Sequence, residues 1–170
     1  MDIVVKESDL IKASEEGVDE FLKVFVDKYK STVGTEVSAG TMSELNAYQH
    51  TLLAYDLFRE QINEGGFVQL IQNGYGGYIF HNPFAKSLKM FGATKLGKLI
   101  YAAKEIYDQH KEELEKETTE EEFYSMYVDF EVFDELEEQF FEIEEESTTI
   151  IATYVDEHID LFATVDKGNG

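Results

Sequence analysis

The 170-residue chain has no cysteine and a single proline. The absence of cysteine excludes disulfides and thiolate metal sites. The scarcity of proline favours long helices, because proline interrupts helical hydrogen bonding. No apolar run approaches the roughly 20 residues that a membrane-spanning helix needs. Residues 1–10 lack the basic region of a signal peptide. We therefore expect a cytoplasmic protein.

Positive charge is also scarce, because 14 Lys and Arg stand against 36 Asp and Glu, for a net charge of −22. Such a protein repels nucleic acid and anionic lipid and attracts basic partners. We expect a basic protein partner, with no direct nucleic-acid binding and no membrane; whether the chain forms a homodimer stays open. Apolar residues make up 43% and aromatic residues 14% of the chain, which predicts a folded core.

Common catalytic and metal-binding signatures are absent. None of the four histidines follows a Glu three residues earlier, so the paired Glu-x-x-His pattern of di-iron bundles is missing. The chain also lacks a His-Glu-x-x-His zinc motif, a Gly-x-x-x-x-Gly-Lys phosphate loop and a Gly-x-Ser-x-Gly nucleophile elbow. His110 lies on an apolar helical stripe and is interpreted as a core residue. We expect no enzyme, no catalytic residue, no cofactor and no metal.

Apolar residues recur at helical spacing and predict an all-α fold. We expect one compact multi-helix domain over residues 1–170, with flexible segments at 1–7 and 164–170. The central helix has apolar residues on more than one side, so it should be buried beneath the others. The last predicted helix is long and acidic. A further helical face, with Phe123, Met126 and Tyr127, is predicted between 119 and the break near 129. The other predicted helices cover 18–31, 43–63, 67–73, 83–91, 94–114 and 134–162.

Local signals predict where these helices begin and end. Thr41, Thr118 and Thr119 each stand three residues before a Glu, which is the capping-box pattern at a helix start. Gly65-Gly66 should end the central helix, because glycine tolerates the left-handed C-cap conformation. Residues 74–77, Gly-Tyr-Gly-Gly, are interpreted as a turn, and a break is predicted near 129–132.

The segment at 61–73 reads QINEGGFVQLIQN. It resembles the Glu-Val-x-Asn-Gly-Gly-Phe-x-Gln-Tyr-Phe-x-Asn signature of the DNA mimic protein 19 C-terminal domain family, also called domain of unknown function 4375. The flanking LNAYQHTLLAYDLF, FDELEEQFFEIEEE and IATYVDEHIDLF are also similar to that family, so the family-like core covers about 43–162. The chain departs from the signature at Gln61, Glu64 and Leu70-Ile71.

The resemblance implies an all-α domain. It also implies a protein that imitates DNA and occupies a DNA-binding protein, because the family takes its name from such a member. We interpret the motif residues themselves as structural: the glycines would shape a turn, the Phe would fill the core, and the Gln and Asn would hydrogen-bond loop backbone. These residues are Gly65, Gly66, Phe67, Gln69 and Asn73.

Negative charge is concentrated in residues 111–146, the acidic segment. This segment has 17 acidic and two basic residues, whereas the rest of the chain carries a net charge of −7. One continuous helix of this length would carry about one net negative charge per 3.6 Å, and one strand of B-DNA carries a phosphate about every 3.4 Å. Aromatic residues should hold the segment to a packed core; they are Phe123, Tyr124, Tyr127, Phe130, Phe133, Phe140 and Phe141.

Four functions are compatible with these features. The first is a DNA mimic whose acidic face binds and blocks the DNA-contacting surface of a basic nucleic-acid-binding protein, with a role in transcription regulation. The second is an acidic immunity or antitoxin-type inhibitor of a basic toxin or nuclease. The third is an acidic structural domain without mimicry, and the fourth is an enzyme with a deep polar pocket. The predicted partner-binding face consists of Glu112, Glu113, Glu120, Glu121, Asp134, Glu137, Glu138, Glu144 and Glu145.

Overall fold

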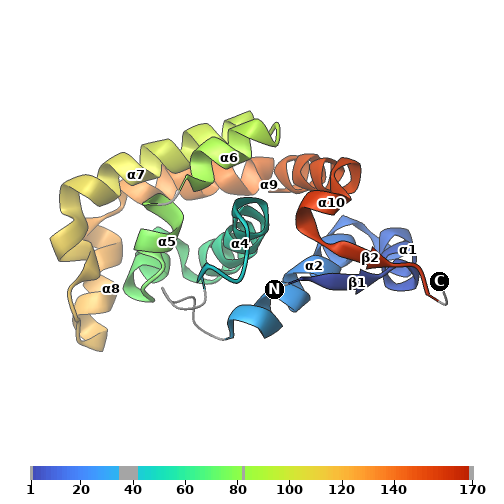
Figure 1. Cartoon of the computed structure of the whole chain (residues 1–170). Helices are drawn as coiled ribbons and strands as arrows, with labels where there is room; N and C mark the ends of the chain where they lie inside the picture. Colours follow the sequence, from blue (N-terminus) through green and yellow to red (C-terminus); the bar gives the residue numbers. More distant parts are fainter. Residues whose placement is uncertain (1, 35–41, 82, 169–170) are drawn as a thin grey trace. The chain divides into compact units, whose positions relative to one another are not determined.

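The structure is a computed structural model that describes residues 2–34, 42–81 and 83–168. These residues form an all-α fold with two additional strands of three residues each. Figure 1 labels the helices and strands along the ribbon. The elements are β1 (Val4–Lys6), α1 (Glu7–Glu16), α2 (Val18–Val33), α4 (Ala47–Gln72), α5 (Gly76–Phe80), α6 (Phe84–Met90), α7 (Thr94–Glu115), α8 (Glu120–Asp129), α9 (Val132–Glu157), α10 (Ile159–Phe162) and β2 (Thr164–Asp166). The prediction of an all-α fold is confirmed.

Internal contacts divide the chain into two compact units. Unit 1 comprises residues 1–53 and 148–170, and unit 2 comprises residues 54–147. Helices α4 and α9 each contribute residues to both units. The behaviour of residues 1–170 as a single domain stays a prediction. Within the described residues, no helix is both long enough and apolar enough to cross a membrane.

In unit 1, strands β1 and β2 pair in parallel, with Val4 opposite Thr164 and Lys6 opposite Asp166. The sequence analysis predicts neither strand and expects flexible segments there instead. Beside the strands, Tyr29 of α2 is fully buried and donates a hydrogen bond from its hydroxyl to the Phe162 carbonyl at 2.8 Å. This bond satisfies the buried hydroxyl and joins α2 to α10.

Helix α4 begins later than the sequence predicts, because a different capping box forms. The Asn46 side chain accepts a hydrogen bond from the Gln49 amide, and the Gln49 side chain accepts one from the Asn46 amide. This reciprocal pair satisfies two free amides at the helix start. The start predicted at residue 43 is therefore wrong, and Thr41 lies outside the described residues.

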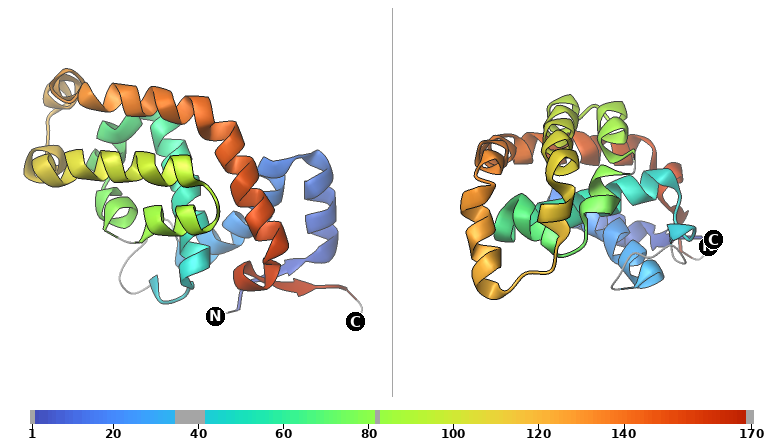
Figure 2. Two further views of the ribbon diagram at one scale, coloured as in Figure 1. Left: turned by 90° about the horizontal axis from the view of Figure 1, so that it is seen from above. Right: turned by 90° about the vertical axis from the view of Figure 1, so that its left-hand side faces the viewer.

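In unit 2, the α4 residues are buried against two other helices, as predicted for the central helix. Phe58 lies 4.9 Å from Phe140 of α9 between ring centroids, and Phe67 lies 5.1 Å from Phe133. Gln72 donates from its amide to the Leu114 carbonyl of α7. Figure 2 shows that α8 links α7 to the first part of α9 and that these two helices run in opposite directions.

Several predicted helices match the structure and two features differ. The helices predicted at 18–31 and 94–114 correspond to α2 and α7, and the break predicted near 129–132 separates α8 from α9. The helix predicted at 134–162 is interrupted at His158, whose φ of −135° and ψ of 39° leave the helical region. Residues 76–80 form helix α5, where the sequence analysis predicts a turn.

Candidate functional site

The acidic segment lies entirely within unit 2. It is distributed over the end of α7, all of α8 and the first part of α9. The structure therefore does not contain the single continuous helix on which the spacing comparison was based. Fifteen of the 17 carboxylates belong to exposed residues, so the segment nevertheless presents a strongly acidic surface.

Helix α8 is fixed at its start by the predicted capping box. The Thr119 hydroxyl accepts a hydrogen bond from the Glu122 amide, and the Glu122 side chain accepts one from the Thr119 amide. These two bonds lower the pKa of the Glu122 carboxyl, because they favour its charged form. The Glu122 carboxylate is therefore held, in its charged form, in a defined position in the first turn of α8.

The end of α7 is also tied to the core of unit 2. Tyr107 is fully buried and donates from its hydroxyl to a Glu115 carboxylate oxygen. Burial, followed by the hydrogen bond to Glu115, raises the pKa of the Tyr107 phenol above its ordinary value, so the phenol remains a donor at neutral pH. Because Tyr107 is buried, this hydrogen bond fixes the last turn of α7, where Glu115 lies, to the core of unit 2.

Seven of the nine residues predicted for the partner-binding face are exposed; they are Glu112, Glu113, Glu120, Glu121, Asp134, Glu138 and Glu145. Glu144 and Glu137 are half-buried and have internal partners. Glu144 forms an ion pair with Arg59, with 3.0 Å between Nε and the carboxylate oxygen. Glu137 accepts a hydrogen bond from the Phe67 amide at 2.8 Å. These two side chains contribute to the internal structure of unit 2.

The motif residue Gly66 explains where Glu137 lies. Gly66 has a φ of 76° and a ψ of −169°, a combination that is accessible essentially to glycine alone. This conformation breaks the helix and frees the Phe67 amide. The Glu137 carboxylate accepts a hydrogen bond from that amide. Burial is the larger effect on Glu137 and raises the pKa of its carboxyl, although the Phe67 hydrogen bond opposes the change. The predicted break at Gly65-Gly66 is confirmed.

The remaining motif residues form a side-chain network. Phe67 is fully buried. Gln69 and Asn73 donate from their side-chain amides to the side-chain oxygen of buried Gln61, at 3.2 and 2.7 Å. The expectation that Gln69 and Asn73 bond loop backbone through their side chains is therefore wrong. Gln61 provides the acceptor one helical turn before the glycines, so the network joins the two helical parts on either side of Gly66.

The aromatic residues of the acidic segment do not all pack inward. Phe130, Phe133 and Phe140 are buried, but Tyr124 is 61% exposed and Phe141 is 48% exposed. Val128, one turn after Tyr124 on α8, is 73% exposed. The prediction that all seven aromatic residues hold the segment to the core is therefore wrong for Tyr124 and Phe141. The buried side of α8 is instead marked by Met126, which lies two residues from both Tyr124 and Val128 and therefore on the opposite side of the helix.

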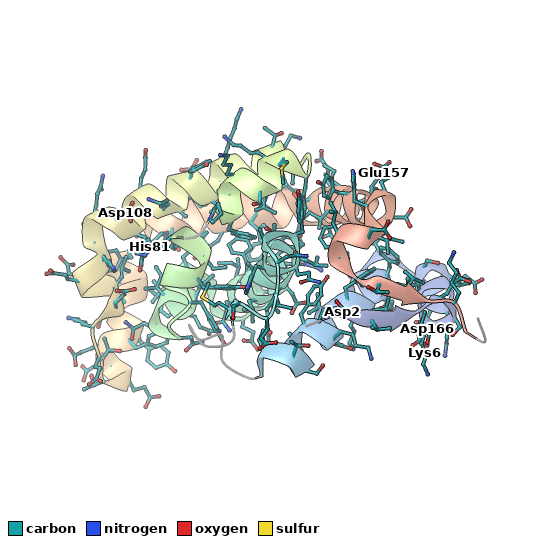
Figure 3. The ribbon with its side chains drawn as sticks, in the orientation of Figure 1. Asp2, Lys6, His81, Asp108, Glu157 and Asp166 are labelled. Carbon is teal, nitrogen blue, oxygen red and sulfur yellow. The ribbon has the colours of Figure 1, made fainter. Side chains whose placement is uncertain are left out.

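Outside the acidic segment, a cluster of ionisable groups lies between the end of α5 and α7. Figure 3 labels His81, at the end of α5, and Asp108 on α7. His81 Nε2 lies 3.9 Å from Asp108 Oδ1, and Lys104 Nζ lies 2.6 Å from Asp108 Oδ2. In the part of the chain that the structure describes, no three His, Cys, Asp or Glu side chains come together in an arrangement that would hold a metal ion.

A polar hollow of about 330 Å³ lies in unit 1, lined in part by Asp2, Glu44 and Asp160. Two further lining residues, Asn46 and Gln49, cap α4, and their side-chain amides also donate to carbonyls of residues 161 and 162. These polar groups are thus engaged in holding α4 and α10 together.

Comparison with known proteins places these features in a family. The family described as DMP19-like protein matches residues 43–158, a range that contains the glycine motif and the whole acidic segment. The DNA mimic protein DMP19 of Neisseria meningitidis serogroup B (strain ATCC BAA-335 / MC58) is 34% identical over 128 residues, which cover 75% of this chain and 78% of that protein. This chain belongs to the DMP19-like protein family.

Proposed function

We propose that this protein is a DNA mimic whose acidic surface binds the DNA-contacting surface of a basic protein and blocks it. The observation that carries the proposal is the exposure of 15 of the 17 carboxylates in the acidic segment. The name of the relative from Neisseria meningitidis supports mimicry as the general mode of action.

The exposed carboxylates are only slightly neutralised within the chain. In the described residues, two of the 17 lie within ion-pair distance of a cation: Glu144 pairs with Arg59, and Glu146 lies 3.5 Å from the Lys95 ammonium. The Lys95 pair is highly exposed, so it contributes little to stability. The carboxylates of this surface repel one another, and they attract a basic partner.

The spacing of charge on α9 supports the comparison with DNA. Between Asp134 and Glu146, six exposed acidic residues occur over 13 helical residues. At 1.5 Å per residue this is roughly one carboxylate per 3.3 Å, against about one phosphate per 3.4 Å on a DNA strand. A carboxylate accepts the bidentate Arg hydrogen bond that a phosphate accepts. Lys and Arg placed to contact phosphates can therefore contact this helix.

The test is competition for a partner captured from lysate at low salt. DNA and this protein should exclude one another from that partner, and affinity should fall as salt rises, because exposed charges are screened within about 8–10 Å at physiological ionic strength. A variant with Glu112, Glu121, Glu138 and Glu145 changed to Lys should lose binding while keeping its helicity.

A matched control separates position from net charge. Changing Glu15, Glu16, Asp27 and Glu157 to Lys alters the net charge by the same amount, at exposed positions of unit 1. This control should retain binding. A complex containing partner, DNA and this protein together would contradict mimicry, as would full binding by the variant of the acidic surface.

A further inference from the structure

The α8 patch, defined as Tyr124 and Val128, is an exposed apolar part of the acidic surface. These side chains are 61% and 73% exposed, and they lie four residues apart on one helix. Residues with this spacing are neighbours on the same helix face. An isolated exposed apolar residue is ordinary, but this pair occurs in the most acidic part of the chain.

Carboxylates adjoin the patch on its own helix. Glu120 and Glu121 are exposed and precede Tyr124 by four and three residues, so one turn of α8 presents a phenol ring beside two negative charges. The Tyr124 ring is supported from one side by Phe123, at 5.8 Å between ring centroids. The aromatic ring and the carboxylates together are suited to a cation with a flat, weakly hydrated face.

Helix α8 holds the patch in a fixed position. Its start is capped by Thr119 and Glu122, and Met126 is buried on the opposite side. The Tyr127 hydroxyl donates to the Gly65 carbonyl at 2.9 Å. Because these contacts already order the helix, a partner can bind the patch without first ordering it.

We propose that the α8 patch binds an Arg side chain of the basic partner, with the guanidinium over the Tyr124 ring and its charge met by Glu120 and Glu121; this inference rests on the proposed function. The surrounding negative charge argues against a second copy of this chain as the occupant, because two such surfaces would repel each other. Arg suits the patch better than Lys does, because the planar guanidinium stacks on aromatic rings and bonds carboxylates bidentately.

The test uses two synthetic peptides of equal length and charge, one built on Arg and one on Lys, titrated into the full chain. The Arg peptide should bind more tightly. Tyr124→Ala should weaken the Arg peptide by about two- to five-fold, the size of an exposed cation–π contact, and should change the Lys peptide less. Tyr124→Phe, which keeps the ring, should retain most of the preference for Arg.

Tyr101→Ala is the matched control. Tyr101 is also an exposed tyrosine of unit 2, at 42%, but its ring already faces Lys89, whose ammonium lies 4.8 Å from the ring centroid. Its loss should leave the Arg-to-Lys ratio unchanged.

The outcomes separate the patch from the acidic surface. If Tyr124→Ala leaves the Arg-to-Lys ratio as it is in the wild-type protein, the patch is not an Arg site and the inference is overturned, while the proposed function stands. If the variant with Glu112, Glu121, Glu138 and Glu145 changed to Lys binds both peptides as the wild type does, the acidic surface is not the binding site and both proposals fail.

Discussion

Replacement of Gly66 by Val should destabilise the protein by about 3–5 kcal/mol. The backbone of Gly66 lies in a region where other residues cost about 1–3 kcal/mol. A Cβ at this position would also lie 2.7 Å from the Glu137 carboxyl carbon, which would displace the side chain that accepts from the Phe67 amide. A hydrogen bond to a charged group contributes about 1.5–3 kcal/mol, and these two effects together give the expected size.

Urea and thermal unfolding followed by far-UV circular dichroism would measure this change. For a chain of this size, the expected loss corresponds to a fall in Tm of about 10 °C. Gly74→Val is the matched control, because Gly74 also has a positive φ, of 90°, but a Cβ there would have no heavy atom within 4 Å. It should lose only the backbone part.

A double-mutant comparison isolates the Glu137 contribution. In a Glu137→Ala background, Gly66→Val should cost about as much as Gly74→Val, because the displaced contact has already been removed. If Gly66→Val and Gly74→Val lower the free energy of unfolding equally in the wild-type background, the contact between the bend and Glu137 carries no stability and the reasoning is refuted.

Three further changes test other contacts by the same unfolding measurements. Asn46→Ala removes the cap of α4 and the bond to Leu161 and should cost about 1–2 kcal/mol; no loss would contradict the capping role. Tyr127→Phe removes the hydroxyl that donates to Gly65 and should cost about 1 kcal/mol. The raised pKa of Glu137 means that the folded state binds the Glu137 proton more tightly than the unfolded state does. Protonated Glu137 therefore stabilises the fold below the ordinary pKa of 4.5, and this stabilisation is lost as the pH rises. The stability of Glu137→Gln relative to wild type should therefore increase as the pH rises above 4.5, and a flat or falling difference would contradict this assignment.

Features that depend on one residue type and its immediate neighbours were predictable. The break at Gly66 follows from the paired glycines, because a positive φ is readily accessible to glycine. The Thr119 cap follows from a local pattern of four residues. The cap at Asn46 was not predicted, although Asn46 and Gln49 have the same spacing. Their side chains also bond residues 161 and 162, a contact that the local sequence does not reveal.

Features that depend on distant partners were not predictable from sequence. Strands β1 and β2 are three residues long and 160 residues apart in register, so neither has enough length to show an alternating pattern. Glu137 and Glu144 look like their neighbours in the acidic run and differ only because the Phe67 amide and Arg59 lie opposite them. The exposure of Tyr124 likewise depends on which side of α8 packs, because helical spacing alone does not say which apolar residues meet the core.

The pairing of β1 with β2 has a consequence for the order in which this protein is made. Unit 2 is one continuous stretch, residues 54–147, and every segment it needs has been synthesised once residue 147 has been added. Unit 1 is discontinuous, since Tyr29 and β1 find their partners at Phe162 and at 164–166. Chains grow at about 5–20 residues per second, so helices α1 and α2 wait several seconds for those partners. Helices α1 and α2 are therefore synthesised before unit 2 but completed after it, and until then their apolar faces are available to chaperones.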